Sequence, residues 1–341
     1  MASAVDRGGS AAGSMAYLGQ MADPEATYRL HRGEVTQPRE KAAPGVLTAV
    51  APPAAIAATA TNADRRLALA RWMTDSRNPL VARVISNRIW HYHFGAGLVD
   101  TPSDFGRNGG RPTHPELLDW LACELIDSGW SLKHLHRLIV TSAAYRQSGQ
   151  ARPDGLARDA GSRLLWRFPP RRMEAEAIRD AILLAGGVLD RTMGGPGFDL
   201  FEPNSNYVKV YTPKQTFGPD TFRRMVYQAK PRMQLDDTFG AFDCPDAGQI
   251  APKRSASTTP LQALNLLNSP FLLEQAAGFA RRLEAEAGND PAAQVRRGFL
   301  HAFGRLPADD EARAAVALVR GHGLPALCRA LFNANEFLYQ R

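Results

Sequence analysis

The sequence has few cysteines and no long apolar run, and each shortage excludes a class of protein. None of its three cysteines stands in a C-x-x-C or C-x-x-C-H spacing, which excludes a covalently attached c-type haem and a cysteine-based zinc knuckle. No stretch of about 20 apolar residues is free of charges, so no transmembrane helix is expected. Cys123 and Cys328 fall among apolar helical neighbours and are expected to be buried.

Lysine is also scarce, and this bears on possible partners. Only six of the 41 basic residues are lysines, and the rest are arginines. The formal net charge is +7, but the arginines are spread along the chain and form no basic tract with interleaved aromatic residues. We therefore expect no nucleic-acid binding. Because a guanidinium pairs with phosphate, sulfate or carboxylate through two hydrogen bonds, an anionic partner is the expected one.

The N-terminal part differs from the rest of the chain. Residues 1–62 contain Gly-Gly-Ser and Ala-Pro-Pro-Ala pieces and have no helical period, so they predict an irregular arm lying on the following domain. Within this arm, residues 27–31 predict a strand. The start of the sequence lacks the basic and apolar regions of a secretory signal, so no export signal is expected in this chain.

Residues 63–341 predict one mainly α domain with a Gly- and Pro-rich, partly extended insertion. It is expected to be helical over 63–190, irregular over 191–256 and helical again over 257–341. Capping residues followed by proline mark most helix starts. The predicted helices span residues 63–73, 79–94, 114–128, 132–145, 171–185, 308–320 and 324–337, with three more beginning at Pro260, Pro270 and Pro291. Asn62 is the expected N-cap of the first, Thr113 and Glu116 predict a capping box, and 223–229 predicts a strand.

Several motifs, in the expected order, resemble one family over residues 27–339. They are RLALARWMTDSRNPLVARVISNRIWHYHFGAGLVDTPSDFG, PTHPELLDWLA, LKHLHRLIVTSAAYRQS, RRMEAEAIRDAIL, FDCPD, STTPLQALNLLNSPF and NANEFLY. The chain is similar to the C-terminal domain of planctomycete-type proteins whose N-terminal parts contain cytochrome c-like modules. That domain is one of unknown function (domain of unknown function 1553).

The resemblance implies a setting rather than a reaction. Upstream helical and cytochrome c-like domains of the same protein family are the implied partners, and the periplasm or cell surface is the implied location. The present chain then corresponds to a C-terminal portion of such a protein. Because it has no haem-attachment motif, no cofactor is expected in it.

The helix predicted over 79–94 ends in polar residues that are candidates for ligand binding. Arg88 and His91 share one helix face, beside Asn87, and would bind an anion or transfer a proton. Alternatively, Arg88 forms internal ion pairs and His91 packs near the helix C-terminus, where a cation is favoured. His91 and His93 point in different directions on a helix and cannot bind one zinc ion together, so no metal site is expected.

Five further arginines complete the expected anion site: Arg172, Arg179, Arg223, Arg224 and Arg254. Arg172 and Glu176 are four residues apart and are expected to share a helix face. The preferred interpretation is an accessory or binding module whose Arg-rich cleft takes an anionic partner or a glycan. Alternatively, buried Arg–carboxylate pairs only tie the insertion to the helical frame.

Two other interpretations stay open, and so does the question of whether the chain is an enzyme. A glycan-acting hydrolase would use Asp104, His114 and the Asp180 or Asp243 carboxylates in acid–base catalysis. Its sugar would stack on aromatic rings from the insertion, namely Tyr207, Tyr211 and Phe217. A structural scaffold that packs on a missing upstream domain would instead expose apolar surface around residues 1–62.

Overall fold

The computed structural model is mainly α-helical, as the sequence predicts, and divides into two compact units. Unit 1 is Met1–Ser142 and unit 2 is Ala143–Arg341. The structure describes residues 22, 24–52, 56–202, 210–231, 234, 236–245 and 247–340, with only the backbone of 3–4, 17–18 and 237–238. A separate arm over residues 1–62 stays a prediction.

Unit 1 is built on α2 (Pro79–Phe94), α3 (Pro115–Asp127) and α4 (Leu132–Thr141), which follow α1 (Asn62–Met73). Two antiparallel hairpins precede them: β1 (Ser3–Ala4) with β2 (Tyr17–Leu18), and β3 (Tyr28–Leu30) with β4 (Pro38–Lys41). The 3-10 turn η1 (His31–Gly33) follows β3, which confirms the strand predicted over 27–31.

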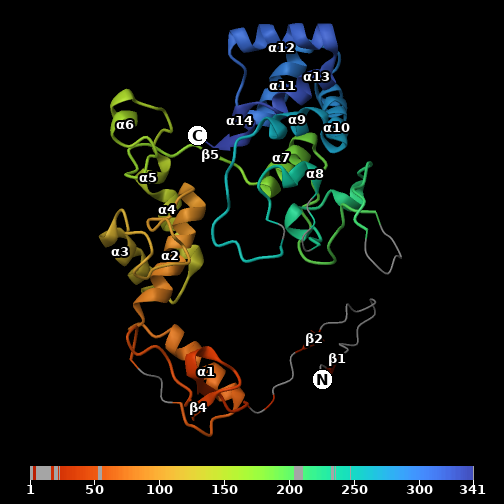
Figure 1. The fold of residues 1–341 in the computed structure, drawn as a ribbon. Coiled ribbons are helices and arrows are strands. Elements are labelled where there is room, and N and C mark those ends of the chain that lie inside the picture. The colour runs from red at the N-terminus through yellow and green to blue at the C-terminus, as the bar shows by residue number, and fades with distance from the viewer. Residues whose placement is uncertain are drawn as a thin grey trace. The chain divides into compact units, whose positions relative to one another are not determined.

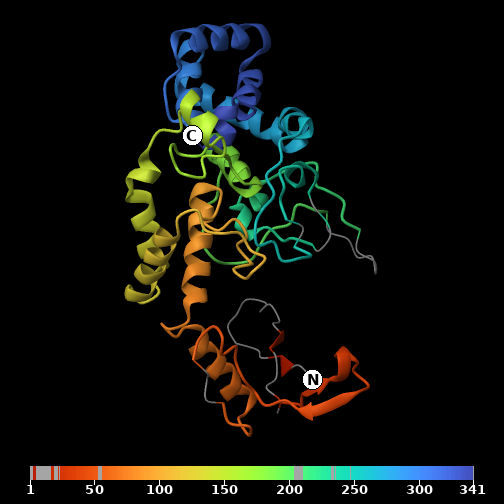
Figure 2. The ribbon, with the colours of Figure 1, turned by 60° about the vertical axis from the view of Figure 1, so that its left-hand side comes forward.

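The core of unit 1 lies between α2 and the two helices beside it (Figure 2). Its buried side chains recur every three or four residues, as in Leu118, Leu121 and Leu125 of α3. Cys123 lies off this apolar stripe and is exposed, so its predicted burial is wrong, whereas Cys328 in unit 2 is fully buried. All three cysteines are free.

The N-cap residues in the structure can be compared with those predicted from the sequence. The N-caps Asn78 and Ser131 are confirmed, because each side chain accepts a hydrogen bond from the first turn of its helix. The predicted caps of α1 and α3 are wrong. Thr61, not Asn62, caps α1 through a reciprocal capping box, and the Thr113 hydroxyl donates to the Leu98 carbonyl instead of capping α3.

Unit 2 holds most of the helices. Its elements are α5 (Ala143–Arg146), α6 (Pro153–Arg158), β5 (Arg171–Arg172), α7 (Ala175–Gly186), η2 (Pro219–Thr221), η3 (Met225–Tyr227), α8 (Asp237–Gly240), α9 (Pro260–Asn268), α10 (Pro270–Ala287), α11 (Pro291–Phe303), α12 (Asp309–His322), α13 (Leu324–Phe332), α14 (Asn335–Leu338) and β6 (Tyr339–Gln340). The starts at Pro260, Pro270 and Pro291 are confirmed. The helices predicted over 132–145 and 324–337 are each divided in two.

The core of unit 2 is centred on α10, which contacts α7, α9, α11 and α13. In Figure 1, α12 lies at the outer end of this group, against α11 and α13. Phe279 of α10 stacks on Phe332 of α13, and both rings are fully buried. Burial of such a side chain stabilises the fold by about 1.5–3 kcal/mol. This core provides a rigid frame for α7.

The predicted start of the helix at residue 171 is wrong. Arg171 and Arg172 form a short strand, β5, that pairs antiparallel with β6, and α7 begins only at Ala175. Arg172 therefore does not share a helix face with Glu176. The strand partner comes from the far end of the chain, so the local sequence pattern contains no sign of it.

The insertion is irregular, as predicted, and isolated bridges hold it instead of a sheet. Asp190 pairs with Arg223, Phe198 with Gln228, and Phe201 with Pro213. The strand predicted over 223–229 is wrong, because η3 occupies its centre. The insertion is thus a loop that folds back against the end of α7.

Candidate functional site

A cavity of about 940 Å³ lies in unit 2 along one side of α7. Such a volume is within the range of small-molecule sites. Its apolar wall consists of Ala177, Ala181, Leu184, Leu189, Met225 and Val226. Its charged groups are Glu174, Glu176, Asp180, Arg191, Arg224, Lys230 and Arg254. Because α7 presents every third or fourth side chain to the cavity, Glu176 and Asp180 lie on the same face of the helix.

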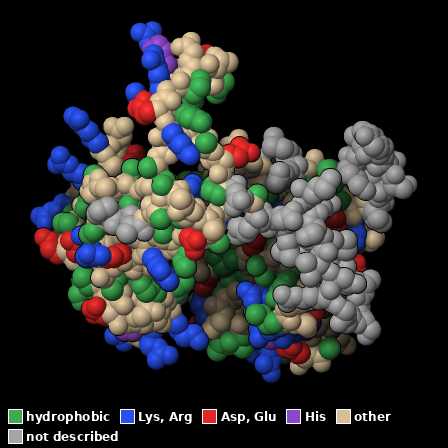
Figure 3. Space-filling view, turned by 90° about the horizontal axis from the view of Figure 1, so that it is seen from below, with side chains coloured by type: hydrophobic (Ala, Val, Ile, Leu, Met, Phe, Trp, Pro, Cys, Tyr) green, Lys and Arg blue, Asp and Glu red, His purple; other side chains and the backbone are tan. Residues whose placement is uncertain are grey.

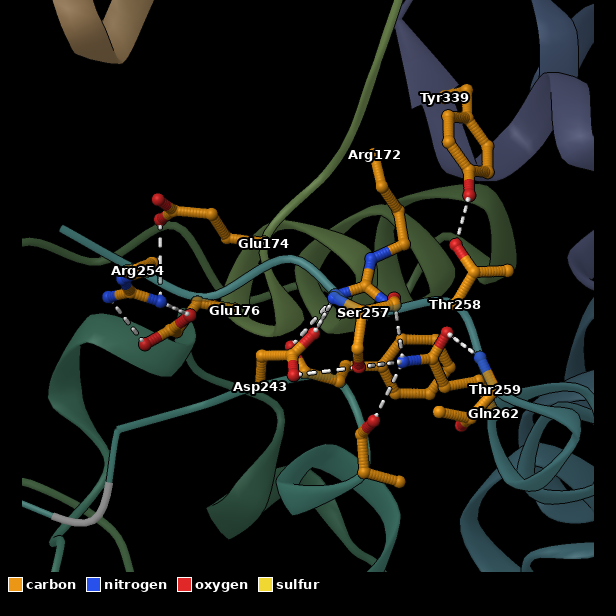
Figure 4. Close-up of polar contacts among 12 residues, drawn as sticks. Arg172, Glu174, Glu176, Asp243, Arg254, Ser257, Thr258, Thr259, Gln262 and Tyr339 are labelled. Atoms are coloured by element: carbon orange, nitrogen blue, oxygen red, sulfur yellow. Dashed lines mark hydrogen bonds and ion pairs between the residues drawn. The ribbon is translucent and has the colours of Figure 1, made fainter. Parts of the chain in front are cut away.

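Glu176 is the centre of an ion-pair network in this cavity. Arg254 donates to both of its carboxylate oxygens, at 2.6 and 3.1 Å, and Lys230 donates to one of them at 2.8 Å. Arg254 also lies 3.5 Å from Glu174, as the left half of Figure 4 shows. Burial alone would raise the pKa of Glu176, but the hydrogen bonds from Arg254 and Lys230 outweigh it and lower the pKa to about 2.

A thiol lies behind this network. The Lys230 ammonium is 3.2 Å from Cys244 Sγ, and burial raises the pKa of that thiol. Burial would lower the pKa of Lys230, yet its hydrogen bond to Glu176 raises it overall. Lys230 therefore stays protonated, and Cys244 stays a neutral thiol.

Asp180 is held less tightly than Glu176. It accepts a hydrogen bond from the Met225 amide at 2.8 Å, and its nearest guanidinium groups, those of Arg224 and Arg179, are 3.8 and 3.9 Å away. Burial raises the pKa of Asp180, and these partners only partly oppose the effect. Asp180 therefore occupies few of the N–H donors of Arg224.

Two cations at this cavity keep donors free for a ligand. The Arg224 side chain is 47% exposed, and its closest carboxylate contact is the 3.8 Å approach to Asp180. Arg191 is exposed and has no ion pair or hydrogen bond from its side chain to another residue that the structure describes. Arg254, by contrast, is occupied by Glu176 and Glu174.

Most of the other predicted arginines bind the protein itself. Arg179 is fully buried and donates to the Thr221 and Arg223 carbonyls, and burial lowers its pKa to about 10. Arg223 donates to the carbonyls of Thr192, Gly194 and Pro196, and its guanidinium lies 4.0 Å from the Tyr227 ring centroid. Arg179 thus fixes the insertion to α7, whereas Arg223 links two parts of the insertion to each other.

Arg172 belongs to a separate polar cluster, shown in the centre of Figure 4. It donates to Asp243 at 2.6 Å, and Asp243 also accepts from the Ser257 amide and hydroxyl. Burial would raise the pKa of Asp243, but these donors lower it overall. Gln262 completes the cluster by donating to the Ser257 carbonyl. The contacts tie β5 to the segment that leads into α9.

The candidate residues of unit 1 are arranged around a loop. Asn87 is fully buried, donates to the Val99 carbonyl at 2.9 Å and accepts from the Val99 amide at 2.8 Å. Arg88 donates to Ser103 Oγ at 3.2 Å. His91 lies one turn further along α2, with its ring edge-on to Tyr92 at 5.7 Å. Asn87 therefore anchors the loop after α2.

The four candidate acid–base residues are divided between the units. In unit 1, Asp104 accepts from the Gly106 amide, and His114 Nδ1 lies 2.9 Å from Thr113 Oγ1. In unit 2, Asp180 lines the cavity and Asp243 is enclosed by its donors. Acid–base catalysis by these groups stays a prediction.

The aromatic platform expected for a sugar is only partly described. Tyr207 lies outside the described residues, Phe217 packs edge-on against the buried Phe271, and Tyr211 packs edge-on against Phe201. No aromatic ring is among the described residues that line the α7 cavity. In the part of the chain that the structure describes, no three His, Cys, Asp or Glu side chains are grouped as a metal site, and no helix is long and apolar enough to cross a bilayer.

Three charged residues of the cavity were not predicted from the sequence: Glu174, Arg191 and Lys230. Lys230 meets Glu176 across 54 residues of chain, and no spacing rule links them. The stacked carboxylates of α7 were the available signal. On the face drawn in Figure 3, the Lys and Arg side chains of the described residues are dispersed among apolar and acidic ones.

The chain matches a known protein family. A family model described as PSD1, protein of unknown function (DUF1553), matches residues 65–319. The matched range is well over half of the chain and includes every residue that lines the α7 cavity. No curated protein and no solved structure matches the chain.

Proposed function

We propose that this chain, which belongs to the family PSD1, protein of unknown function (DUF1553), is a binding module that takes an anionic group in the α7 cavity. The observation that carries the proposal is the pair of arginines at this cavity, Arg191 and Arg224. Most of their guanidinium N–H groups donate to no other residue that the structure describes. A guanidinium binds carboxylate or sulfate through two parallel hydrogen bonds.

The charge pattern of the cavity supports an anion rather than a cation. Glu176, whose pKa is lowered to about 2, is already neutralised by Arg254 and Lys230. Asp180 has a raised pKa and receives the Met225 amide, so it competes weakly for Arg224. An incoming anion therefore meets two cations that no strong internal partner holds.

The wall of the cavity indicates what carries the anionic group. Ala177, Ala181 and Leu184 form an apolar strip along α7, and Val226, which also lines the cavity, is 70% exposed. A ligand that combines a carboxylate or sulfate with an apolar body buries this strip and pairs with the arginines. An acidic glycan uses the arginines but gains little from the strip.

The experiment is a calorimetric titration of the full chain with inorganic sulfate, acetate and a longer alkyl carboxylate, repeated on Arg224→Ala and Arg191→Ala. Each variant is expected to weaken binding by about 10- to 100-fold, because a charge-assisted hydrogen bond contributes about 1.5–3 kcal/mol. The matched control is Arg320→Ala, an exposed site on α12 that changes the net charge equally.

Two results would contradict the proposal. One is the absence of binding by any of the three anions at low ionic strength. The other is equal weakening by Arg320→Ala, which would show that only the overall charge matters. A gain in affinity from acetate to the longer carboxylate would support a role for the apolar strip.

The setting of the module is part of the proposal. The family resemblance supports an extracytoplasmic location and a partnership with upstream helical and cytochrome c-like domains. Helix α1 suits such a partner, because it contributes no buried residue and exposes Leu67, Leu69 and Met73. Expression with the upstream domains is expected to slow hydrogen exchange in α1, and unchanged exchange would refute this contact.

A further inference from the structure

A second cavity in unit 2, of about 800 Å³, has a different chemistry from the first. Three stretches that are distant in sequence form it: residues 147–151 after α5, Thr258 before α9, and Asn335 with Tyr339 near the end of the described chain. Arg167 and Pro170 complete the lining. Arg167 is its one charged residue among the described ones, whereas the α7 cavity has seven.

The lining is rich in groups that both donate and accept hydrogen bonds. Gln147, Gln150 and Asn335 contribute side-chain amides, and Ser148, Thr258 and Tyr339 contribute hydroxyls. An amide presents a donor and an acceptor at a fixed spacing, and a hydroxyl serves as either. Such a surface suits a ligand that is itself covered with hydroxyl groups.

Several of these groups are held in place by the protein. The side-chain amide nitrogen of Gln147 donates to the Leu165 carbonyl at 2.9 Å, so its amide oxygen can accept a hydrogen bond from a ligand. Arg167 donates to Ser162 Oγ at 2.9 Å, and its guanidinium lies 4.8 Å from the Trp166 ring centroid. Lining groups fixed in this way lose little side-chain entropy when a ligand binds.

Other side chains in the same lining have hydrogen-bonding groups that no described residue uses. The Gln150 and Asn335 side chains are exposed and make no hydrogen bond to another residue in the described part of the chain. Tyr339 directs its hydroxyl at Thr258 Oγ1, 3.4 Å away, as the right side of Figure 4 shows. The cavity thus combines positioned groups with free ones.

We infer that this second cavity binds an uncharged, polyhydroxylated ligand, specifically a neutral oligosaccharide. Planar amides and a guanidinium match pairs of adjacent sugar hydroxyls, and the Tyr339 ring supplies one apolar surface for a sugar face. An extended peptide fits less well, because β5 and β6 are only two residues each and offer too little edge for an added strand.

The inference goes beyond the anionic site, because it concerns another cavity and a ligand without charge. The test is a calorimetric titration of the full chain with cellohexaose, maltohexaose, xylohexaose and mannohexaose. An uncharged, blocked tetrapeptide serves as the peptide probe. At least one oligosaccharide is expected to bind, with an affinity that does not change with salt, since no ion pair forms.

Variants locate the binding. Asn335→Ala and Gln150→Ala are each expected to weaken oligosaccharide binding about tenfold, as loss of one or two hydrogen bonds does. Both positions are exposed, and neither side chain bonds to a described residue, so the fold is retained. Arg191→Ala in the α7 cavity is the control and is expected to change sulfate binding but not sugar binding.

Four outcomes overturn the inference: no oligosaccharide binds, the peptide binds in its place, both lining variants bind as the wild type does, or Arg191→Ala removes sugar binding. The two proposed sites can be refuted independently of each other. Loss of sulfate binding with sugar binding intact refutes only the anionic site, and the reverse refutes only the second cavity.

Discussion

At the scale of the residue, the most informative side chain is Glu176. Three N–H donors from two cations converge on one carboxylate that is 19% exposed. Removing one partner of such a network costs more than the pair itself contributes, because a buried charge is then left uncompensated. Glu176 is therefore a structural acid of the cavity wall and unsuited to act as a general acid near neutral pH.

Acid is expected to remove this contribution. Because the pKa of Glu176 falls from 4.5 to about 2 on folding, the unfolded chain binds the proton more readily, and the stabilisation is complete above the unfolded pKa. Glu176→Gln is expected to lower the free energy of unfolding by about 2–3 kcal/mol at pH 7, and the difference from wild type is expected to shrink as the pH falls from 5 toward 2.

Urea unfolding at several pH values measures this difference. The matched control is Glu284→Gln, an exposed site on α10, which is expected to change stability little at any pH. A Glu176→Gln deficit that stays constant between pH 5 and pH 2 would mean that the network does not depend on the ionised carboxylate.

At the scale of the element, helix N-caps can be predicted from the sequence, whereas contacts between distant segments cannot. The N-caps Asn78 and Ser131 act within four residues of themselves, so the sequence predicts them. Two nitrogens of the Arg172 guanidinium donate to Asp243 and Ser257, 71 and 85 residues away, and no local pattern contains that information. The helical parts and the family could thus be predicted, while the wall of the α7 cavity could not.

Arg179 shows the same limit within one helix. Its position on α7 is readable, but its fully buried guanidinium donates to two carbonyls of the insertion. The sequence places it in the expected anion site, because a guanidinium pairs with carboxylate or sulfate through two hydrogen bonds. An irregular segment needs donors for its carbonyls, and here a helix side chain provides them.

The loop after α2 gives a prediction at this scale. A Cβ on Gly97 would lie 2.4 Å from the Val99 carbonyl oxygen and 2.8 Å from the Asn87 amide, so the close approach requires glycine. Gly97→Ala is expected to destabilise unit 1 by about 1–3 kcal/mol in thermal unfolding. Gly45→Ala, where the new Cβ meets nothing within 4 Å, is the control. Equal effects of the two would show that the Asn87–Val99 contact does not hold the loop.

At the scale of the whole molecule, each unit has its own core. Leu121 belongs to the α2–α4 core of unit 1, and Leu327 belongs to the continuous apolar cluster of unit 2. Since core cavities are felt mainly by the surrounding packing, damage in one unit is expected to stay there.

Hydrogen exchange on the full chain tests this independence. Leu121→Ala is expected to destabilise its unit by about 2–5 kcal/mol and to speed exchange in α2, α3 and α4 only. Leu327→Ala is the reciprocal variant and is expected to speed exchange in α10, α11 and α13. Faster exchange across both units in either variant would show that they unfold as one.

The short ladder between β5 and β6 has a consequence for biosynthesis. Arg171 leaves the ribosome early, but its partner Gln340 is made 169 residues later. During translation the Arg172–Asp243 cluster can form, yet the ladder beside it forms only after β6 has emerged. Nascent chains halted before Tyr339 would therefore have this flank of unit 2 open to chaperones and proteases, whereas unit 1 could already be folded.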